Sequence, residues 1–340
     1  MRVTEEQTPY EARAFWLRAP GSGEIRSESV PGPRPGEALV RTLRSGVSRG
    51  TESLVFSGRV PPSQYAAMRA PFQEGELPGP VKYGYLNVGR VERGSRALRG
   101  RQVFCLYPHQ TAYVVAESAL TLVPEEVPPA RAVLAGTVET ALNAVWDAGV
   151  RPGDRVTVVG AGMVGCCAAR LLATTPGVDV ELVDLEPSRA AVAEALGTRF
   201  ALPADASEGR DLVVHASASS AGLQRSLDLL AFEGTVLELS WYGDRAVQLD
   251  LGGAFHSKRL TIRASQVGAV ARSRRGRRTH GERLALALDL LRDPAFDCLL
   301  TGETAFEELP EVMPRLAGGD RTTLCHGVTY ETGEGAACSA

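Results

Sequence analysis

The stretch "RPGDRVTVVGAGMVGCCAARLL" (residues 151–172) decides the fold. Its apolar first half predicts a buried strand, and its second half predicts a helix over residues 163–174. Gly160, Gly162 and Gly165 join the two in a Gly-x-Gly-x-x-Gly pattern. The first glycine allows a tight turn, the second lets a pyrophosphate approach the backbone, and the third packs the helix against the strand. Because free amides at a helix start also favour phosphate, the stretch predicts a dinucleotide site.

A carboxylate at the end of the next strand indicates which dinucleotide is bound. The strand "VDVELVD" (178–184) ends at Asp184, about 20 residues beyond the glycine pattern, where a carboxylate can bind the adenosine ribose hydroxyls. Since a carboxylate repels a 2′-phosphate, NAD(H) is favoured over NADP(H). Arg189 would either cap the same ribose or grip a 2′-phosphate. The cofactor-binding residues expected in this region are Gly160, Gly162, Met163, Val164, Gly165, Asp184 and Arg189.

Composition limits the other possibilities. A chain of 340 residues is too long for one ordinary core, so two domains are expected. Apolar residues make up 44% and charged residues 23%, as in soluble globular proteins. The net charge of −3 gives no reason to expect nucleic acid or a membrane as a partner. No apolar run reaches the roughly 20 residues of a membrane helix, and the first residues lack a signal-peptide core, so a cytoplasmic location is expected.

The pattern of elements changes along the chain. Residues 1 to 125 contain short alternating strands separated by Pro/Gly turns. Residues 130 to 275 alternate strands with helices, which predicts an α/β domain with a parallel sheet. An arginine-rich loop follows, and then a helix over 282–293. Six cysteines without a Cys-x-x-Cys pair indicate small core residues rather than disulfides or zinc ligands.

Four segments together resemble a known family. They are "VRPGDRVTVVGAGMVG" (150–165), "GPVKYGYLNVGRVERG" (79–94), "TVETALNAVW" (137–146) and "FEELPEVMPRLAGGDRTTLCHGVTY" (306–330). The chain resembles the medium-chain dehydrogenase/reductase superfamily over nearly all of residues 10–330. The resemblance implies a GroES-like β-rich catalytic domain, a Rossmann doubly wound parallel sheet, and a homodimer. The implied division is a catalytic domain at 1–135, a Rossmann domain at 136–278, a return to the catalytic domain at 279–330, and a disordered tail at 331–340.

The resemblance also indicates that catalytic zinc is missing. In the zinc alcohol dehydrogenases, the turn that matches "SGVSRGTE" (45–52) carries a cysteine ligand where this chain has Ser48. Tyr85 stands where a histidine ligand is expected, and Gly136 stands at the third ligand position. The four-cysteine lobe is reduced to Cys105. A hydroxyl, a phenol and a glycine do not make a tetrahedral zinc site, so a zinc-free protein is expected.

Without a metal, hydrogen-bond donors must stabilise the substrate oxygen and a proton must still move. Tyr85 is the leading proton donor, with Lys82 expected to lower its pKa; alternatively, these residues only shape the pocket wall. Thr51 and Glu52 would serve a proton relay, or Glu52 would be a buried salt-bridge partner. Glu139 would orient the substrate, act as a base, or cap a helix. The catalytic candidates are Tyr85, Lys82, Ser48, Glu52 and Glu139.

The resemblance adds further cofactor contacts. Arg49 matches an arginine that contacts the pyrophosphate, and Thr140 matches a threonine near the nicotinamide. Ser217 and Trp241 follow Rossmann strands at the edge where the cofactor is expected, together with His215. His109 would face the substrate or, as favoured here, satisfy a strand turn.

The loop "ARSRRGRRTHGER" (271–283) is the most strongly charged segment. It would be a solvated face or a clamp for an anionic substrate.

These observations predict a zinc-independent NAD(H)-dependent oxidoreductase that acts on a secondary alcohol or ketone of a polar, possibly anionic small molecule. Three alternatives remain: an NADPH-dependent C=C reductase of the enoyl or quinone type, an enzyme that uses NAD transiently for epimerisation or elimination, and a non-catalytic NAD-binding redox sensor.

Overall fold

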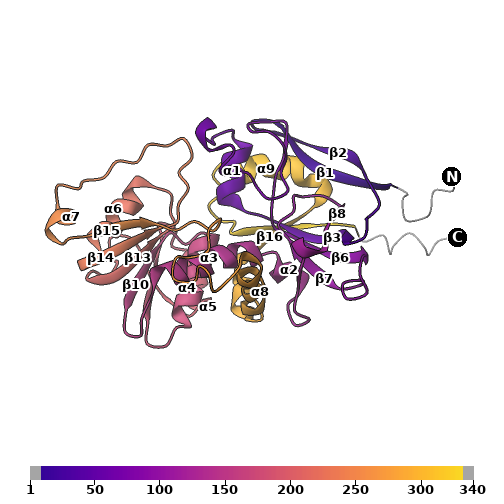
Figure 1. Ribbon diagram of the computed structural model, residues 1–340. Coiled ribbons are helices and arrows are strands. Elements are labelled where there is room, and N and C mark those ends of the chain that lie inside the picture. The colour runs from indigo at the N-terminus through magenta and orange to yellow at the C-terminus, as the bar shows by residue number, and fades with distance from the viewer. Residues whose placement is uncertain (1–8, 332–340) are drawn as a thin grey trace, which may run out of the picture. The chain divides into compact units, whose positions relative to one another are not determined.

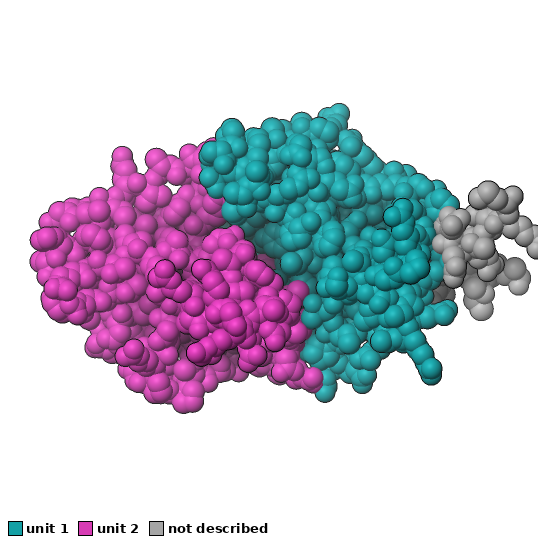
Figure 2. Space-filling model, viewed as in Figure 1, with its two compact units in different colours: residues 1–136, 300–340 teal, residues 137–299 magenta. Residues whose placement is uncertain are grey.

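The computed structural model describes residues 9–331, which form two compact units. Unit 1 contains the described parts of residues 1–136 and 300–340, and unit 2 contains residues 137–299 (Figure 2). The sequence-based start of the C-terminal return at residue 279 lies before the division at residue 300, because the helix that follows residue 279 packs within unit 2. The predicted tail lies outside the described residues, apart from residue 331.

Unit 1 is built from two largely antiparallel sheets (Figure 1). The larger sheet has the order β16-β17-β3-β6-β7-β9, with β8 also pairing with β3, and the smaller has the order β2-β1-β5-β4. An isolated bridge between Ala14 and Gln110 links β1 to the segment before β8. The strands are β1 (Tyr10–Ala19), β2 (Ser22–Val30), β3 (Glu37–Val47), β4 (Glu74–Gly75), β5 (Val81–Lys82), β6 (Asn87–Arg93), β7 (Gln102–Cys105), β8 (Ala112–Ala116), β9 (Thr121–Leu122), β16 (Leu300–Ala305) and β17 (Cys325–Thr329); the α-helices are α1 (Arg49–Phe56), α2 (Pro129–Ala132) and α9 (Leu309–Ala317).

Unit 2 is a six-stranded parallel sheet with the order β12-β11-β10-β13-β14-β15 (Figure 1). The order reverses between β10 and β13, and ligands bind at such switch points, outside the carboxyl ends of the strands. The strands are β10 (Arg155–Val159), β11 (Asp179–Val183), β12 (Arg199–Ala201), β13 (Arg210–His215), β14 (Leu230–Glu238) and β15 (Thr261–Ala264); the helices are α3 (Ala135–Ala148, which begins at the unit boundary), α4 (Met163–Ala173), α5 (Arg189–Ala195), α6 (Ser220–Asp228), α7 (Ala254–Ser257) and α8 (His280–Leu290). Together the units confirm the expected fold class.

The segment 45–52 differs from the expected turn. Strand β3 continues to Val47, and α1 begins at Arg49. The Glu52 carboxylate accepts a hydrogen bond from the Ser48 amide at 2.7 Å, which satisfies one of the donors that a helix start leaves free. Thr51 and Glu52 therefore lie on a helix, and Gly50 lies inside it.

Among residues 9–331, no helix is long and apolar enough to cross a membrane.

Candidate active site

The glycine turn of unit 2 has the geometry of a pyrophosphate-binding loop. Gly160 has a φ of +108°, and a Cβ there would lie 2.6 Å from the Ser217 nitrogen. A Cβ on Gly165 would lie 1.9 Å from the Gly160 carbonyl oxygen, so only glycine allows this approach of helix and strand. A Cβ on Gly162 would meet nothing within 4 Å, which leaves open space beside the start of α4. The residues present thus fit a dinucleotide phosphate group.

Asp184 connects the end of β11 to this turn. Its Oδ2 accepts from the Ala161 amide at 2.7 Å, and its Oδ1 accepts from the Glu186 amide at 2.9 Å. The carboxylate is half-buried at the carboxyl end of the sheet, as a ribose contact requires. Arg189 is 5% exposed and close enough to Cys166 to act on its pKa. Its burial favours a packing role, and its contact with the ribose stays a prediction.

The other expected cofactor residues occupy different elements. Met163 and Val164 begin α4, Thr140 lies half-buried in α3, and Trp241 follows β14. Arg49 is the first residue of α1. Ser217 follows β13 and is hydrogen-bonded to His215 and Ser219. Their cofactor contacts remain predictions.

A chain of hydrogen bonds in unit 1 brings together the residues expected to move a proton. The Tyr85 hydroxyl donates to Ser48 Oγ at 2.7 Å, and the Ser48 amide donates to Glu52. Glu52 Oε2 lies 2.9 Å from His109 Nε2. His109 Nδ1 lies 2.7 Å from Ser45 Oγ, which is 2.8 Å from the Tyr330 hydroxyl. This Tyr85–Tyr330 chain crosses the unit from the half-buried Tyr85 to buried side chains.

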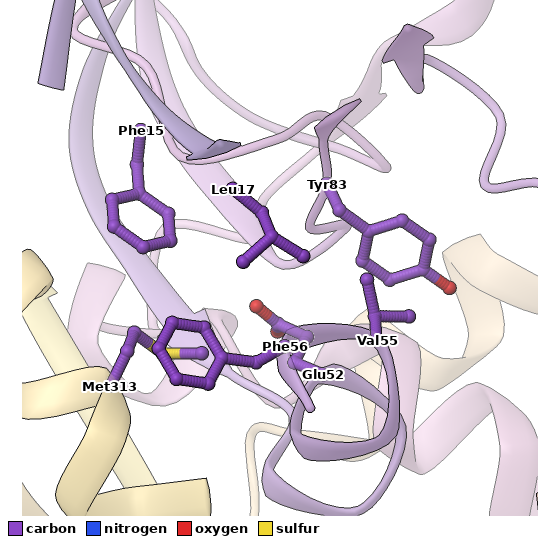
Figure 3. A pocket seen from close by; sticks show the side chains of 7 residues that line it. All are labelled: Phe15, Leu17, Glu52, Val55, Phe56, Tyr83 and Met313. Atoms are coloured by element: carbon purple, nitrogen blue, oxygen red, sulfur yellow. The ribbon is translucent and has the colours of Figure 1, made fainter. Parts of the chain in front are cut away.

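Glu52 is the central carboxylate of this chain. It is 4% exposed and points among the apolar side chains of Phe15, Leu17 and Phe56 (Figure 3). These residues line a cavity of about 20 Å³, which has room for about one water molecule. Glu52 is buried and contacts both His109 and the Ser48 amide. Both sequence-based alternatives for Glu52, a buried salt-bridge partner and a member of a proton relay, agree with these contacts.

His109, expected from the sequence mainly to satisfy a strand turn, has a different set of contacts in the structure. Its side chain is 1% exposed and contacts two polar residues rather than only satisfying a turn. Gly84, with a φ of +134°, passes so close that a Cβ would lie 3.0 Å from the His109 ring. The glycine at position 84, next to Tyr85, is the sequence signal for this close approach, because glycine readily adopts a positive φ and has no side chain to meet the ring.

The expected effect of Lys82 on Tyr85 is wrong in direction. Burial, and secondarily the charge of Glu52, raise the pKa of Tyr85 to about 12. Lys82 is fully buried, and its Nζ donates to Glu28 at 2.8 Å, to Gln110 at 2.6 Å and pairs with Glu74 at 2.7 Å. Its charge is thus compensated by two carboxylates on β2 and β4, and its role is structural.

The raised pKa of Tyr85 predicts a loss of stability in alkali. An unfolded tyrosine loses its proton near pH 10, whereas folded Tyr85 does so near pH 12. The contribution of the neutral phenol is therefore complete below pH 10 and is lost as the pH rises through 12. Between pH 9 and 12, we expect the free energy of unfolding of the parent to fall by about 2 kcal/mol more than that of Tyr85→Phe, because only the parent has this phenol. Urea titration measures both proteins. Equal falls in the two proteins would contradict the expectation.

Glu139 lies in a buried ion pair rather than at a reacting centre. It is 4% exposed, and its Oε1 accepts from Arg283 Nε at 3.0 Å, which joins α3 to α8 (Figure 1). Burial raises the pKa of Glu139 even though Arg283 opposes the shift. Arg283 also donates to Asn143 at 2.5 Å and to the Val267 carbonyl at 2.6 Å. This ion pair favours a structural role for Glu139, and its expected role as base or substrate ligand stays a prediction.

Removing Arg283 is expected to destabilise unit 2 strongly. Arg283→Met would leave the Glu139 carboxylate buried without its partner, which costs about 3–5 kcal/mol in free energy of unfolding. Arg278→Met is the matched control, because Arg278 is exposed and its nearest carboxylate, on Glu282, is 4.0 Å away. Chemical denaturation measures both variants. A loss below 1 kcal/mol in Arg283→Met would show that the pair contributes little.

Arg283 also differs from the other arginines of the basic loop. Arg283 is 1% exposed, whereas the remaining arginines are exposed. For these exposed arginines, both interpretations remain, a solvated face and a clamp for an anionic substrate. Those exposed arginines are Arg272, Arg274, Arg275, Arg277 and Arg278.

At the three positions where the resemblance places zinc ligands, the chain has the hydroxyl of Ser48, the phenol of Tyr85 and the glycine Gly136. Ser48 and Tyr85 contact each other, as the resemblance requires of two ligand positions. A Cβ on Gly136 would lie 2.6 Å from Leu86, so a larger residue at this position requires Leu86 to move. Within residues 9–331, no cluster of three or more His, Cys, Asp or Glu is arranged to hold a metal. Zinc independence itself stays a prediction.

Comparisons with known proteins agree with the fold. No protein-family model matches the chain. L-galactonate-5-dehydrogenase of Escherichia coli K12 is 24% identical over 279 residues, which covers 71% of this chain and 79% of that protein. The solved L-idonate 5-dehydrogenase of Escherichia coli superposes with a TM-score of 0.78 at 14% identity, covering 96% of this chain and all of the other.

Structures solved with cofactor are also similar. A protein of Escherichia coli CFT073 described as a short chain alcohol dehydrogenase, solved with NADH, superposes with a TM-score of 0.75 at 16% identity, covering 94% of this chain and 99% of the other. A protein of Sinorhizobium meliloti described as a zinc-binding dehydrogenase, solved with NADP, superposes with a TM-score of 0.75 at 17% identity, covering 94% of this chain and 99% of the other. The chain shares the fold of these dehydrogenases and a distant sequence relationship with one of them, which supports an alcohol dehydrogenase-like oxidoreductase and the expected resemblance to the medium-chain dehydrogenase/reductase superfamily.

Proposed function

We propose that the chain is a zinc-independent, NAD(H)-dependent oxidoreductase acting on a secondary alcohol or ketone of a polar small molecule. The observation that carries this proposal is the 2.7 Å hydrogen bond between Tyr85 and Ser48, which stand at two ligand positions of the zinc enzymes. Two hydroxyl groups there offer donors to a substrate oxygen in place of a Lewis acid.

The hydrogen-bond directions support donation to the substrate. Because the Tyr85 hydroxyl donates to Ser48 Oγ, the hydroxyl proton of Ser48 remains free for a substrate oxygen. The nicotinamide, when bound, supplies or accepts the hydride. An alkoxide formed on reduction is far more basic than a phenolate of pKa about 12, since its alcohol has a pKa near that of water, about 15.7. Proton transfer from Tyr85 through Ser48 to that oxygen is therefore favourable.

Glu52 and His109 position the donors of the proposed relay. Burial, and secondarily the charge of Glu52, raise the pKa of Tyr85, and Glu52 orients Ser48 by accepting a hydrogen bond from the Ser48 amide. His109 lies against the other oxygen of the same carboxylate. These residues position the donors, whereas Ser48 and Tyr85 act on the substrate.

The choice of NAD over NADP rests on Asp184. Its carboxylate stands at the end of β11, where it accepts ribose hydroxyls and repels a 2′-phosphate. The sugar-acid names of the relatives favour a polyol or hydroxy acid as substrate. The homodimer and the cytoplasmic location remain predictions.

Elemental analysis and cofactor titration on one sample test the proposal. We expect less than about 0.1 zinc per chain after dialysis, and NADH binding at least about ten times tighter than NADPH by fluorescence, a difference of about 1.4 kcal/mol. Oxidation of a panel of polyols and aldonates with NAD would then identify the substrate. Stoichiometric zinc would contradict the assignment of Ser48 and Tyr85, and tighter NADPH binding would favour the C=C reductase.

A further inference from the structure

A second polar cluster in unit 2 has the connectivity of a serine nucleophile with its base. Ser217 Oγ lies 2.6 Å from His215 Nε2, and His215 Nδ1 lies 2.8 Å from Glu238 Oε2. The imidazole is fully buried, whereas Ser217 is half-buried. This serine–histidine–glutamate order, with the histidine bonded through both ring nitrogens, is that of the hydrolase triads found on unrelated folds.

The hydrogen atoms in the cluster follow from its partners. Glu238 accepts hydrogen bonds from the Ser240 amide at 2.7 Å and the Tyr242 hydroxyl at 2.9 Å. Burial raises the pKa of Glu238, but the contacts with His215 and Ser240 outweigh it and lower that pKa. An ionised Glu238 accepts only, so His215 Nδ1 carries the hydrogen and, in the neutral ring, Nε2 is the acceptor. The Ser217 hydroxyl must then donate to Nε2, which is the arrangement that activates a serine.

The surroundings of Ser217 are shaped around this contact. A Cβ on Gly222 would lie 2.2 Å from Ser217 Oγ and 3.0 Å from His215 Nε2, so only glycine leaves the contact intact. Ala218, the next residue, has a φ of +50°, a strained conformation of the kind that gathers at functional sites. Ser219 Oγ lies 2.9 Å from Ser217 Oγ and accepts from the Gly222 amide at 3.0 Å, so Ser219 can donate to Ser217.

Helix α6 begins just after the serine and supplies anion stabilisation. The Gly222 amide in its first turn donates to Ser219 Oγ, the amides of Ser220 and Ala221 precede any carbonyl partner within the helix, and the positive dipole end lies at Ser220. An open pocket lies beside this turn; Ser220, Ala221, Gln224 and Gln248 are among the residues that line it, and it begins three residues after Ser217. Such donors stabilise the oxyanion of acyl transfer.

We propose that Ser217 is an activated serine nucleophile that cleaves small activated esters when no dinucleotide is bound. Ser217 Oγ bonds to the carbonyl carbon while its proton passes to His215 Nε2; the C–O bond to the leaving alcohol then breaks, and that oxygen takes the proton. Water then loses a proton to His215 Nε2 as its oxygen bonds to the acyl carbon; the bond from that carbon to Ser217 Oγ breaks, Oγ takes the proton back from His215, and the acid is released. The net reaction is hydrolysis, and it does not depend on the proposed dehydrogenase activity.

A fluorophosphonate probe tests the proposal on the nucleotide-free protein. Attack by Ser217 forms an O–P bond and releases fluoride, and peptide mass spectrometry locates the adduct. We expect a single adduct on Ser217, formed at least about 100-fold more slowly in His215→Gln, the effect of losing a general base. Gly222→Ala should slow labelling similarly by displacing Ser217. Ser257→Ala, which removes an exposed hydroxyl at the end of α7, should label like the parent.

Several results would overturn the proposal. A known serine hydrolase labelled in parallel shows that the probe is active. The melting temperature shows that the parent protein is folded. A folded parent protein that remains unlabelled would then contradict the proposal. An adduct that is spread over exposed serines, or equally fast in His215→Gln, would also be negative. If His215→Gln does not fold, Glu238→Gln tests the same relay with the same expected slowing. NADH titration of each variant reports cofactor binding separately.

Discussion

Gly165→Ala is expected to lose both stability and cofactor binding, whereas Gly162→Ala loses cofactor binding alone. A methyl group at position 165 would lie 1.9 Å from the Gly160 carbonyl oxygen, which is backbone and can move only by separating α4 from β10. We expect a loss of about 3 kcal/mol or more in free energy of unfolding. At position 162 the methyl group meets no atom and φ is −79°, so stability should change by less than about 1 kcal/mol.

Binding separates the two glycines further. The methyl group of Gly162→Ala would occupy the open space that a pyrophosphate needs, so NADH should bind at least about 100-fold more weakly, or by about 2.7 kcal/mol. Thermal unfolding and fluorescence titration on both variants make the comparison. Unchanged NADH affinity in Gly162→Ala would show that this turn does not hold the pyrophosphate. Unchanged stability in Gly165→Ala would show that the helix moves at little cost.

Tyr85→Phe is expected to abolish most of the turnover without affecting cofactor affinity. The substitution removes the hydroxyl that donates to Ser48 and leaves the ring. Loss of a general acid lowers kcat by about 100-fold to 1,000-fold. The rates are measured with a substrate identified in the alcohol panel, and NADH affinity by fluorescence should stay within about twofold.

Tyr83→Phe is the matched control for this variant. The Tyr83 ring packs edge-on against the Tyr85 ring with centroids 6.1 Å apart. The substitution Tyr83→Phe therefore removes a hydroxyl of the same kind from a neighbouring ring. We expect its kcat within about threefold of the parent. Equal losses in both variants would assign the two rings to the pocket wall, and a small loss in Tyr85→Phe would move the proton donor elsewhere.

Local patterns predicted the parallel sheet well. The strand over 155–159 and the start of the helix at Met163 agree with the structure, because apolar runs and glycines act over neighbouring residues. The segment around Ser48 was harder, since its glycines indicated a turn while Glu52 caps a helix instead.

Partner choice was the main source of error in the site. Lys82 pairs with Glu28 and Glu74, and Glu139 pairs with Arg283, which is 144 residues away. A sequence shows that such charges exist, but long-range packing decides which of them meet. The same limit hid His109, whose link to Glu52 spans 57 residues.

The Tyr85–Tyr330 chain also constrains the order in which the two units can fold during synthesis. Strand β17 pairs with β3, and Tyr330 lies beside Ser45, yet the whole of unit 2 is translated between them. The parallel sheet can therefore fold on the ribosome while the first sheet still lacks its last strands. Because domains generally fold as units during synthesis, residues 9–136 must wait with an unpaired strand edge until residue 330 emerges. Ribosome-bound chains in which residues 137–299 have emerged but residues 300–330 have not should consequently protect unit 2, but not β3, from proteolysis.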